Sequence, residues 1–451
     1  MSDHPIAAVI LAAGKGTRMK SALPKVLHKV GGMPLIGHII AALEPLAPAL
    51  QVVVVGPEMD SVTAAVAPIP TAVQSDRLGT ADAVKAARPS LQGFENGTVF
   101  VLFGDTPFIA PETLSAMIDA RRAGAGIVVL GFEPEDPAEY GRLVTNNAGA
   151  LEAIVEFRDA DEATRAIGLC NSGVMAIDAA RLFDLIDRIG NDNAKGEYYL
   201  TDIVALARAD GMECRVIVAD ESELLGINSR TELADAEAQW QGRARNAAMD
   251  GGATLLDPAT VYFSWDTIVG QDVVIGQNVV FGPAVHISDN VEIKAFSHLE
   301  GCRVSSGAVI GPYARLRPGA EIGEGARVGN FVEVKNATLG TGAKANHLSY
   351  IGDAQVGARA NIGAGTITCN YDGYLKHRTV IGEEAFIGSN SALVAPVTIG
   401  QRATVGAGST ITKPVSDDSL ALARGDQKEH VGMAARMRQR LKARKDALKN
   451  S

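Results

Sequence analysis

The chain has 451 residues, of which 47% are hydrophobic and only 5% are aromatic. This length exceeds what one hydrophobic core usually organises, so we expect two or three domains. The net charge of −10 argues against nucleic acid as the main partner. No run of about 18 uninterrupted apolar residues is present, which argues against insertion into a membrane.

The cysteines point to a reduced compartment. Cys170, Cys214, Cys302 and Cys369 are far apart in the sequence and form no C-x-x-C pair, which favours a cytoplasmic protein. The first residues, MSDHPIAAVILAAGKG, carry no basic segment before their apolar run, so we expect no signal peptide.

The first half alternates aliphatic strand-like segments with helix-like segments. Strands are predicted over 7–11, 52–56, 98–105 and 126–132, and helices over 35–43 and 80–91. Continuous aliphatic strands separated by helices predict a parallel sheet that is buried on both faces. Ligands bind such sheets at the carboxyl ends of the strands.

A glycine-rich turn follows the first predicted strand, in LAAGKGTRMKSALP at 11–24. It is neither a P-loop nor a dinucleotide fingerprint, because the required glycine and Lys-Ser/Thr positions do not match. Gly14 and Gly16 would let the backbone approach phosphate groups closely. Arg18 and Lys25 would add positive charge where a pyrophosphate leaving group develops negative charge.

A carboxylate ends the third predicted strand, at Gly104-Asp105. Asp105 suits Mg²⁺ beside phosphate groups. The alternative is that it caps the helix that starts near Pro111.

Between 230 and 250 the sequence RTELADAEAQWQGRARNAAMD has no strand pattern and many helix formers, which predicts a connecting helix in which Trp240 packs against a neighbour.

From Ile268 onward an aliphatic or aromatic residue recurs mostly every six positions over more than 140 residues, with a five-residue step to Val304 that shifts the frame. This repeat is typical of a parallel β-helix. Gly often follows and would allow a tight corner. The predicted inward positions are Val269, Ile275, Phe281, Ile287, Ile293, Leu299, Val304, Ile310, Leu316, Ile322, Val328, Val334, Ile351, Val356, Ile362, Ile381, Ile387, Leu393, Ile399, Val405 and Ile411.

The repeat is interrupted at TCNYDGYLKHRT, residues 368–379. A repeat fold that extrudes a loop of this size usually does so for function. The basic C-terminal tail, 428–451, is either a solvated helix or a surface-binding segment.

The string L-A-A-G-x-G-T-R-M with Pro24-Lys25 resembles the signature of sugar nucleotidyltransferases, and the hexapeptide repeat resembles left-handed β-helices. From about residue 6 to about residue 428, the chain resembles the family of bifunctional N-acetylglucosamine-1-phosphate uridylyltransferase/glucosamine-1-phosphate acetyltransferases. The strings QSDRLGTADAV, ANHLSYIGDA and NIGAGTITCNYDG carry this resemblance most specifically.

The resemblance implies an α/β, Rossmann-like nucleotidyltransferase domain with a mostly parallel sheet at 1–229, a linker helix at 230–250, a left-handed parallel β-helix acetyltransferase domain at 251–427, and the tail at 428–451. It implies two reactions. Acetyl-coenzyme A acetylates glucosamine 1-phosphate, and UTP then transfers its uridylyl group to the product, releasing pyrophosphate. It also implies a homotrimer with sites between neighbouring β-helices.

In the first domain, the resemblance implies that Arg18 and Lys25 serve catalysis and that Asp105 and Asn228 hold Mg²⁺. Gln74, Gly79 and Thr80 would read uracil, and Gly141, Glu156 and Asn171 would contact the sugar. The full set implied for UTP and the nucleotide sugar is Leu11, Ala12, Ala13, Gly14, Lys25, Gln74, Gly79, Thr80, Gly104, Asp105, Gly141, Glu156, Asn171 and Asn228.

In the second domain, a sugar phosphate needs cations, which Arg317 and Lys335 offer. A protonated amine cannot attack a thioester, so a base is needed, and the pKa of a histidine such as His347 suits that role. Glu333 would orient the histidine or the amine. The resemblance adds Tyr350 and Asn361 for the sugar phosphate, and Ala364, Asn370, Tyr371, Ser389, Ala407 and Arg424 for acetyl-coenzyme A.

Two alternatives compete with this interpretation. One is another nucleotidyltransferase, such as an ADP-glucose pyrophosphorylase, whose β-helix only regulates or assembles; such a β-helix is short and lacks the His347 and Asn370-Tyr371 strings. The other is a scaffold that has lost catalysis, which predicts damage at Arg18, Lys25, Asp105 or Asn228. All four are present.

Overall fold

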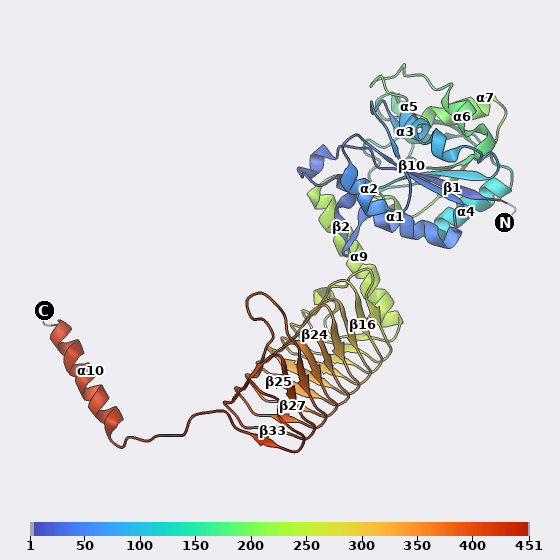
Figure 1. Ribbon diagram of the computed structural model, residues 1–451. Coiled ribbons are helices and arrows are strands. Elements are labelled where there is room, and N and C mark those ends of the chain that lie inside the picture. Colours follow the sequence, from blue (N-terminus) through green and yellow to red (C-terminus); the bar gives the residue numbers. More distant parts are fainter. Residues whose placement is uncertain (1–3, 450–451) are drawn as a thin grey trace. The chain divides into compact units, whose positions relative to one another are not determined.

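The computed structural model describes residues 4–449, and the chain forms two compact units that meet in the sequence between Arg243 and Ala244 (Figure 1). Among the described residues, no helix is long and apolar enough to cross a membrane.

The first unit is built on a nine-stranded sheet. Across the sheet the order is β11 (Cys214–Val218), β7 (Ile127–Phe132), β10 (Cys170–Asp178), β6 (Thr98–Phe103), β1 (Ile6–Leu11), β4 (Leu50–Val55) and β5 (Thr71–Val73), with β8 (Arg142–Thr145) and β9 (Leu151–Val155) attached beside β10. β10 runs antiparallel to β6 and β7, whereas β1, β4, β5 and β6 are parallel neighbours. The predicted mostly parallel sheet is confirmed.

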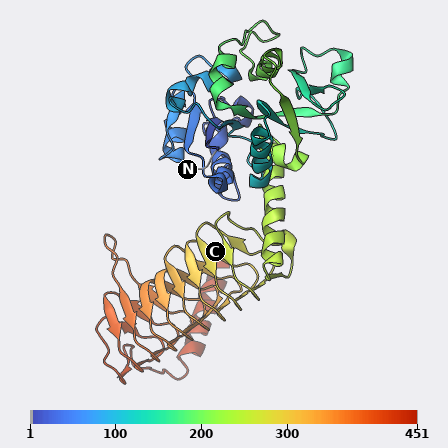
Figure 2. The same cartoon turned by 90° about the vertical axis from the view of Figure 1, so that its right-hand side faces the viewer.

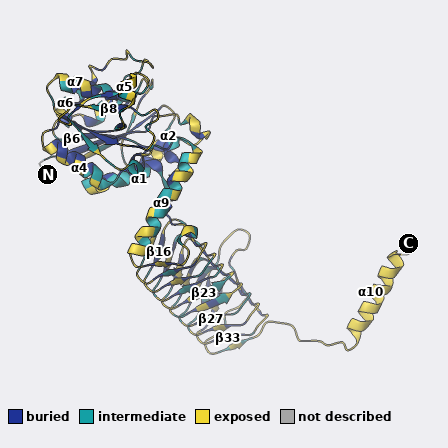
Figure 3. Cartoon of the chain, turned by 180° about the vertical axis from the view of Figure 1, so that it is seen from behind, coloured by how far each residue is buried: buried dark blue, intermediate teal, exposed yellow. Residues whose placement is uncertain are grey.

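Alternation along β1 explains why both faces of this sheet are buried. Ala7 and Val9 point into one apolar cluster, and Ala8 and Ile10 point into the other. The first cluster is covered by α3 (Thr80–Ala86), α6 (Ala179–Ile186) and α7 (Ile203–Ala209), and the second by α1 (Leu35–Leu43), α2 (Asp60–Val66) and α4 (Pro111–Arg122). Figure 3 shows the buried strands between these helices.

Two predicted elements end earlier than their sequence pattern. The helix expected over 80–91 is divided into α3 and the 3₁₀ helix η4 (Arg88–Leu91), because Pro89 cannot donate to a continuing helix. The strand expected over 98–105 ends at Phe103, and the Gly104 amide then donates to the Leu11 carbonyl at 3.0 Å. Asp105 therefore lies in the loop that follows β6.

The remaining short elements of this unit connect the sheet to its helices. They are β2 (Lys29–Val30), β3 (Met33–Pro34), α5 (Glu162–Arg165), α8 (Glu221–Leu224) and the 3₁₀ helices η1 (Thr17–Met19), η2 (Lys25–Leu27), η3 (Glu44–Leu46) and η5 (Leu200–Asp202).

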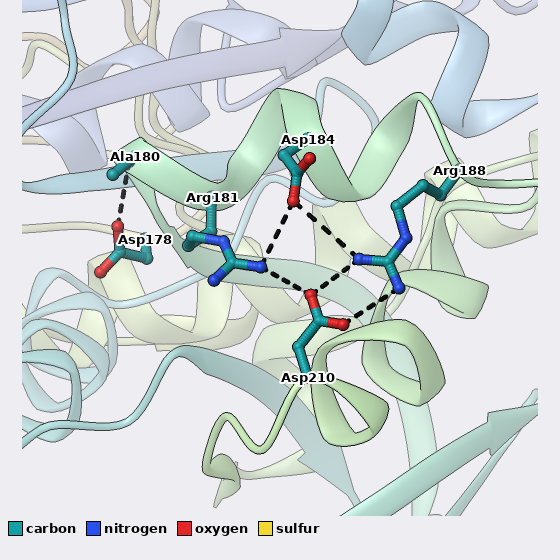
Figure 4. Close-up of polar contacts among 6 residues, drawn as sticks. All are labelled: Asp178, Ala180, Arg181, Asp184, Arg188 and Asp210. Atoms are coloured by element: carbon teal, nitrogen blue, oxygen red, sulfur yellow. Dashed lines mark hydrogen bonds and ion pairs between the residues drawn. The ribbon is translucent and has the colours of Figure 1, made fainter.

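An ion-pair network ties α6 to the end of α7 (Figure 4). Asp210, which follows α7, accepts from Arg181 at 2.6 Å and from Arg188 at 2.7 Å. The hydrogen bond from Arg188 holds the pKa of Asp210 below its ordinary value. Asp178 accepts from the Ala180 amide at 2.9 Å and so caps the start of α6.

The helix α9 spans Arg230–Asp250. Its Trp240 packs on Gly31, where a Cβ atom would lie 2.7 Å from the indole ring. The Gly31 amide donates to Glu237 at 2.8 Å. The N-terminal part of α9 is thus packed against the first unit.

The second unit is a β-helix with three parallel ladders, whose coils are seen edge to edge in Figure 2. One ladder joins β12 (Thr254–Leu255), β14 (Val274–Ile275), β17 (Glu292–Ile293), β20 (Val309–Ile310), β23 (Arg327–Asn330), β25 (Lys344–His347), β27 (Asn361–Ile362), β30 (Phe386–Ile387), β33 (Thr404–Val405) and β35 (Leu420–Ala421).

The other two ladders share the long strands β24 (Glu333–Leu339) and β26 (Tyr350–Val356). One also contains β15 (Val280–Phe281), β18 (His298–Leu299), β21 (Arg315–Leu316), β28 (Ile367–Cys369), β31 (Ala392–Val394) and β34 (Thr410–Ile411). The other contains β13 (Ile268–Val269), β16 (Val285–Ile287), β19 (Cys302–Val304), β22 (Ala320–Ile322), β29 (Thr379–Ile381) and β32 (Val397–Ile399). A short 3₁₀ helix, η6 (Pro258–Thr260), lies near the start.

The predicted inward residues form the interior of this β-helix. All are buried except Val269, near its beginning, which is half-buried. Equivalent residues stack one coil apart, as in Ile293 with Ile310 and Ile310 with Val328. The six-residue period is therefore one side of a three-sided coil.

The glycines that follow the inward residues were expected to allow tight corners, but they have another role. Gly357 and Gly388 do not adopt a left-handed φ, so no corner requires them. Instead, a Cβ atom at Gly357 would lie 2.5 Å from the Glu383 amide nitrogen, and one at Gly388 would lie 2.4 Å from the Ala407 amide nitrogen. These glycines let successive coils approach each other.

The C-terminal segment contains α10 (Met433–Lys449), which has no buried residue among those described.

We expect Ile293→Ala to lower the free energy of unfolding of the β-helix by about 2–5 kcal/mol, because it opens a cavity at a fully enclosed position. Denaturant unfolding followed by circular dichroism measures this loss. Glu292→Ala, on the exposed side of the same strand, is the control and should change stability by less than about 0.5 kcal/mol. Equal losses in the two variants would contradict the inward assignment.

Candidate active sites

A cavity of about 260 Å³ opens at the carboxyl ends of β1 and β6. Several residues predicted to bind the nucleotide line it together: Leu11, Ala12, Ala13, Gly14, Lys25, Gln74, Gly79, Thr80 and Asp105. They come from three separate stretches of sequence, which the parallel pairing of β1 with β4 and β6 brings side by side. This is the edge of the sheet at which ligands were expected.

The Lys25 ammonium lies between two oxygen atoms that accept its hydrogen bonds. It forms an ion pair with Asp105 and donates to Asn228 Oδ1 at 2.9 Å. The Asp105 carboxylate is thus paired with Lys25. The residue before α4 is Ala110, and no side chain caps that helix. The alternative prediction that Asp105 is the helix cap is therefore wrong. A carboxylate and an amide oxygen that converge on one positive charge match the ligand preference of a hard divalent cation.

Gly16 lets the glycine-rich turn fold back on Lys25. Its φ is +58°, and a Cβ atom there would lie 2.6 Å from the Lys25 Cβ. Met19 is buried and anchors η1. Gly14 has open space where a Cβ atom would be, so its backbone faces the cavity freely. The two glycines have different roles.

Gln74 and Gly79 lie in direct contact. The buried Gln74 amide donates to the Gly79 carbonyl at 2.9 Å and to Asp82 at 2.8 Å. Gly79 has φ +124° and faces the Tyr198 backbone, where any Cβ atom would collide. Thr80 Oγ1 accepts from the Leu200 amide at 2.9 Å. This end of the cavity is rigid.

The three predicted sugar contacts do not line this cavity. The backbone N–H of Asn171 donates to the Gly141 carbonyl at 2.8 Å, which pairs these two residues. Glu156 accepts from Thr201 at 3.4 Å. Burial raises the pKa of Glu156, and the nearby charge of Lys195 offsets part of this rise.

Arg18 also lies outside the cavity. It is exposed and, with Asn228, lines a second hollow of about 720 Å³.

Sequence reasoning missed Arg77 in the first cavity. Its Nε donates to the Ala13 carbonyl at 2.9 Å, and its guanidinium lies over Gly56. Arg77 lies within the string QSDRLGTADAV, so a basic residue beside predicted uracil contacts was the available signal. Phe103 and Glu197 also line the cavity, and no sequence pattern singled them out.

In the β-helix, a cluster of charged residues lies on one ladder. Arg317 donates to Glu333 at 2.7 Å, and Glu333 is the ladder neighbour of Tyr350. Lys335 follows on the same strand, and the Lys376 ammonium, then Arg317, lower its pKa. This cluster of cations offers an anion-binding surface.

His347 lies on a different ladder, at the end of β25, and is exposed. Its Nδ1 lies 2.7 Å from Asn330 Oδ1 on the preceding coil. Because an amide oxygen only accepts, this contact places a proton on Nδ1, and in the neutral ring Nε2 is then free to accept one. Asn330, which sequence reasoning missed, therefore orients His347, whereas Glu333 is paired with Arg317.

Asn361 belongs to the same ladder as His347, where it is the register partner of Lys344. Within one chain, the residues predicted to hold the sugar phosphate are thus divided between two ladders: Arg317, Lys335 and Tyr350 on one, and Asn361 on the other.

Three residues predicted to bind acetyl-coenzyme A form a column. Ile362, Ile387 and Val405 are register partners, so Ala364, Ser389 and Ala407, each two residues later, lie on successive coils. Hydrogen bonds from Asn390 to Ala364 at 2.7 Å and from Gly408 to Ser389 at 2.8 Å connect these coils. Arg424 donates to the Ala407 carbonyl at 2.8 Å and extends the column.

Asn370 and Tyr371 begin the extruded loop. Asn370 is buried and contacts Asp353, whereas Tyr371 is exposed and donates to the Gly373 carbonyl at 2.5 Å. Asp372 accepts from the Tyr374 and Leu375 amides at 2.8 and 2.7 Å and lies 2.7 Å from His377. The loop thus has its own hydrogen-bonded structure.

Comparison with known proteins matches the two units of the chain to two different kinds of transferase. Residues 8–174 match the MobA-like NTP transferase domain, and residues 301–336 and 378–413 match the bacterial transferase hexapeptide (six repeats). A bifunctional protein GlmU from Rhodospirillum rubrum is 63% identical over 96% of this chain and 97% of its own length. Those from Paramagnetospirillum magneticum and Rhizorhabdus wittichii are 59% and 60% identical, over 99% and 100% of both chains.

The chain belongs to the bifunctional GlmU family. It is an enzyme with two halves, a nucleotidyltransferase for uridylyl transfer and a hexapeptide-repeat transferase for acetyl transfer. The predicted fold class, family and bifunctional activity are confirmed. A solved structure titled as the inositol-1-phosphate CTP transferase from T. maritima covers 50% of this chain and 90% of its own, at 19% identity and a TM-score of 0.40, which is too weak to bear on the fold.

We expect the affinity for a sugar phosphate to fall as the pH rises through the lowered pKa of Lys335, because the lysine loses its charge there. The Lys376→Gln variant removes the main cause of the lowered Lys335 pKa, so the loss of affinity should move to higher pH. Calorimetric titration with glucose 1-phosphate, which has no titrating amine, measures this. Lys344→Gln is the control. An unmoved alkaline limb in Lys376→Gln would contradict the proximity of the two ammonium groups.

Proposed function

We propose that the chain makes UDP-N-acetylglucosamine in two steps. The β-helix transfers the acetyl group of acetyl-coenzyme A to the amine of glucosamine 1-phosphate. The first unit then joins the resulting N-acetylglucosamine 1-phosphate to the uridylyl group of UTP and releases pyrophosphate. The observation that carries this proposal is the convergence of Lys25, Asp105 and Asn228 at the nucleotide cavity, in a chain whose second half carries His347 with an oriented ring.

Uridylyl transfer needs positioning and charge rather than a protein nucleophile. A phosphate oxygen of the sugar phosphate attacks the α-phosphorus of UTP, and the bond to pyrophosphate breaks. Lys25 would neutralise the negative charge that develops, and Arg18 would do so from the neighbouring hollow. Gln74 and Gly79 would hold the base at the rigid end of the cavity, and Arg77 would support the turn at Ala13.

Asp105 and Asn228 fit a divalent cation, and we propose Mg²⁺. Their oxygens already converge on the Lys25 ammonium, which marks the position as favourable for positive charge. Bound there, Mg²⁺ would neutralise phosphate oxygens and help to align them. Lys25 would then move its contact from Asp105 to a phosphate oxygen.

Acetyl transfer needs a neutral amine. His347 Nε2, left unprotonated by the bond between Nδ1 and Asn330, would accept a proton as the amine attacks the thioester carbonyl. The carbon–sulfur bond then breaks, and the coenzyme A thiolate leaves. Arg317 and Lys335 would bind the phosphate group, and the Ala364–Ser389–Ala407 column would support the coenzyme.

A stripe of exposed apolar side chains beside His347 supports a homotrimer. Phe296 and Tyr313 stack at 5.0 Å, and Tyr313 and Phe331 at 5.1 Å. With Leu348, these residues are between 46% and 60% exposed, and all four have positive φ. Similar positive φ values recur along the β-helix, as at Arg359, Glu384 and Arg402, and the stripe differs from these positions in carrying large apolar side chains.

A second copy seated on this stripe would lie next to the acetyltransferase residues. Phe331 follows Asn330, and Leu348 follows His347. A neighbouring copy seated on the stripe would face His347, so its own Arg317, Lys335 and Tyr350 ladder could complete a site that one chain divides between two ladders. The trimer would thus be required for acetyl transfer.

We also propose a cytoplasmic location. The four cysteines are free thiols. Burial raises the pKa of Cys214 to about 11 and of Cys302 to about 12, so both stay protonated and unreactive. Such unpaired thiols suit a reducing compartment that also supplies UTP and acetyl-coenzyme A.

We expect Asp105→Ala to reduce uridylyl transfer by about a hundredfold or more while acetyl transfer is kept, because it removes the carboxylate proposed to hold the divalent cation at the phosphates. His347→Ala should do the reverse, by about a hundredfold or more, because the base is lost. His298→Ala, an exposed histidine elsewhere on the β-helix, is the control. Separate assays of the two reactions decide, and loss of both activities in either folded variant would refute the division of labour.

We expect Tyr313→Ser combined with Phe331→Ser to dissociate the trimer, because it removes stacked apolar area from the contact. Light scattering after size-exclusion chromatography would then show a lower mass, with acetyl transfer lost and uridylyl transfer kept. Val218→Ser, an exposed apolar residue of the first unit, is the control. A wild-type monomer that is active in acetyl transfer would rule out the trimer.

A further inference from the structure

Asp353 lies at the base of the extruded loop and joins two coils of the β-helix. It is half-buried in β26, with φ +46°. One carboxylate oxygen accepts from the Asn336 amide at 2.5 Å, on the preceding coil. The other accepts from the Asn370 amide, at the start of the loop. Nothing in the sequence motifs singled out Asp353 or Asn336.

The backbone beside Asp353 is fixed from the other side. The buried hydroxyl of Thr368 accepts from the Gly352 amide at 2.8 Å and donates to the Gly352 carbonyl at 3.0 Å. The carboxylate therefore projects from a backbone that cannot easily shift. Asp353 is a rigid support between the coils and the loop.

The hydrogen bond from Asn370 to Asp353 fixes how the Asn370 side chain is turned. Burial raises the pKa of the carboxyl, but the hydrogen bonds from Asn336 and Asn370 and the nearby Lys376 and Lys335 outweigh this and lower it. An ionised carboxylate has no proton to donate, so Asn370 must present its NH₂ group to it. The Asn370 Oδ1 is then directed away from Asp353.

The same contact fixes the path of the loop. Asn370 is buried, and its backbone carbonyl accepts from the His377 backbone amide at 2.8 Å, which joins the first and last parts of the loop. Holding the Asn370 side chain therefore also holds the point at which the loop leaves and rejoins the coil.

We infer that Asp353 is a positioning residue for acetyl transfer: it holds Asn370 so that Oδ1 and the start of the loop are presented to acetyl-coenzyme A. This inference rests on the proposed role of Asn370 in binding acetyl-coenzyme A. Asp353 does not touch the reacting atoms. It acts through Asn370, so its loss should weaken the binding of acetyl-coenzyme A rather than that of the sugar phosphate.

The test uses Asp353→Gly in the full-length chain. Glycine adopts the positive φ without strain, so the substitution removes the carboxylate and leaves the backbone conformation accessible. We expect the KM for acetyl-coenzyme A to rise roughly tenfold or more, as one unsatisfied buried amide would cause. The KM for glucosamine 1-phosphate should not rise, because the lost carboxylate is a negative charge near Lys335. The rate of uridylyl transfer should stay within about twofold of the wild type.

Two further variants distinguish a positioning role of Asp353 from a general loss of β-helix structure. Asn336→Ala removes the other partner of the carboxylate and leaves the contact with Asn370, so its KM for acetyl-coenzyme A should change less than about threefold. In the double variant of Asp353→Gly with Asn370→Ala, the effect should be no larger than that of Asn370→Ala alone, because both changes remove one interaction.

An unchanged KM for acetyl-coenzyme A in Asp353→Gly, or additive effects in the double variant, would overturn the inference. A fall in β-helix stability that accompanies equal losses for both substrates would also overturn it, because it would show a merely structural role. Failure of the proposed function has a different signature: the wild type would show no acetyl transfer, or Asn370→Ala would leave the KM for acetyl-coenzyme A unchanged.

Discussion

The acetyltransferase half depends on one constraint, which is that buried side chains must fill the interior of the β-helix from every side of each coil. The stacking of these buried side chains fixes the register of successive coils, as for Ile362, Ile387 and Val405. Once the register is fixed, residues at equal offsets form columns on the outside, including Ala364, Ser389 and Ala407. The glycines that let coils approach belong to the same constraint, because a side chain there would meet the backbone of the next coil.

The nucleotidyltransferase half depends on a different arrangement, in which parallel strands end at one edge of a sheet. The ends of β1 and β6 bring Leu11 and Gly104 into hydrogen-bond contact, and this places Lys25 beside Asp105. The two halves therefore build their sites by unrelated means. Separate sites let one chain carry out consecutive reactions in which the product of one is the substrate of the other.

The sequence predicts features that depend on local periodicity and on specific strings. All the inward positions that the six-residue repeat predicted are buried except Val269, but the repeat did not predict the second buried residue of many sides, such as Val291 and Ala326. The strand ends predicted the cavity that contains Lys25 and Asp105. It could not predict contacts between coils, because these depend on three-dimensional register. Asn330 beside His347, Asp353 beside Asn370, and Lys376 beside Lys335 are contacts of this kind. Arg77 was within reach of the sequence, but its contact with Ala13 was not.

The central claim is that both reactions occur in this chain and that acetylation precedes uridylyl transfer. A time course by mass spectrometry tests it most directly, with purified protein, glucosamine 1-phosphate, acetyl-coenzyme A, UTP and Mg²⁺. The account predicts that N-acetylglucosamine 1-phosphate appears first and that UDP-N-acetylglucosamine follows, with release of pyrophosphate. Accumulation of UDP-glucosamine, or turnover of added N-acetylglucosamine 1-phosphate without any acetylated product from glucosamine 1-phosphate, would contradict it.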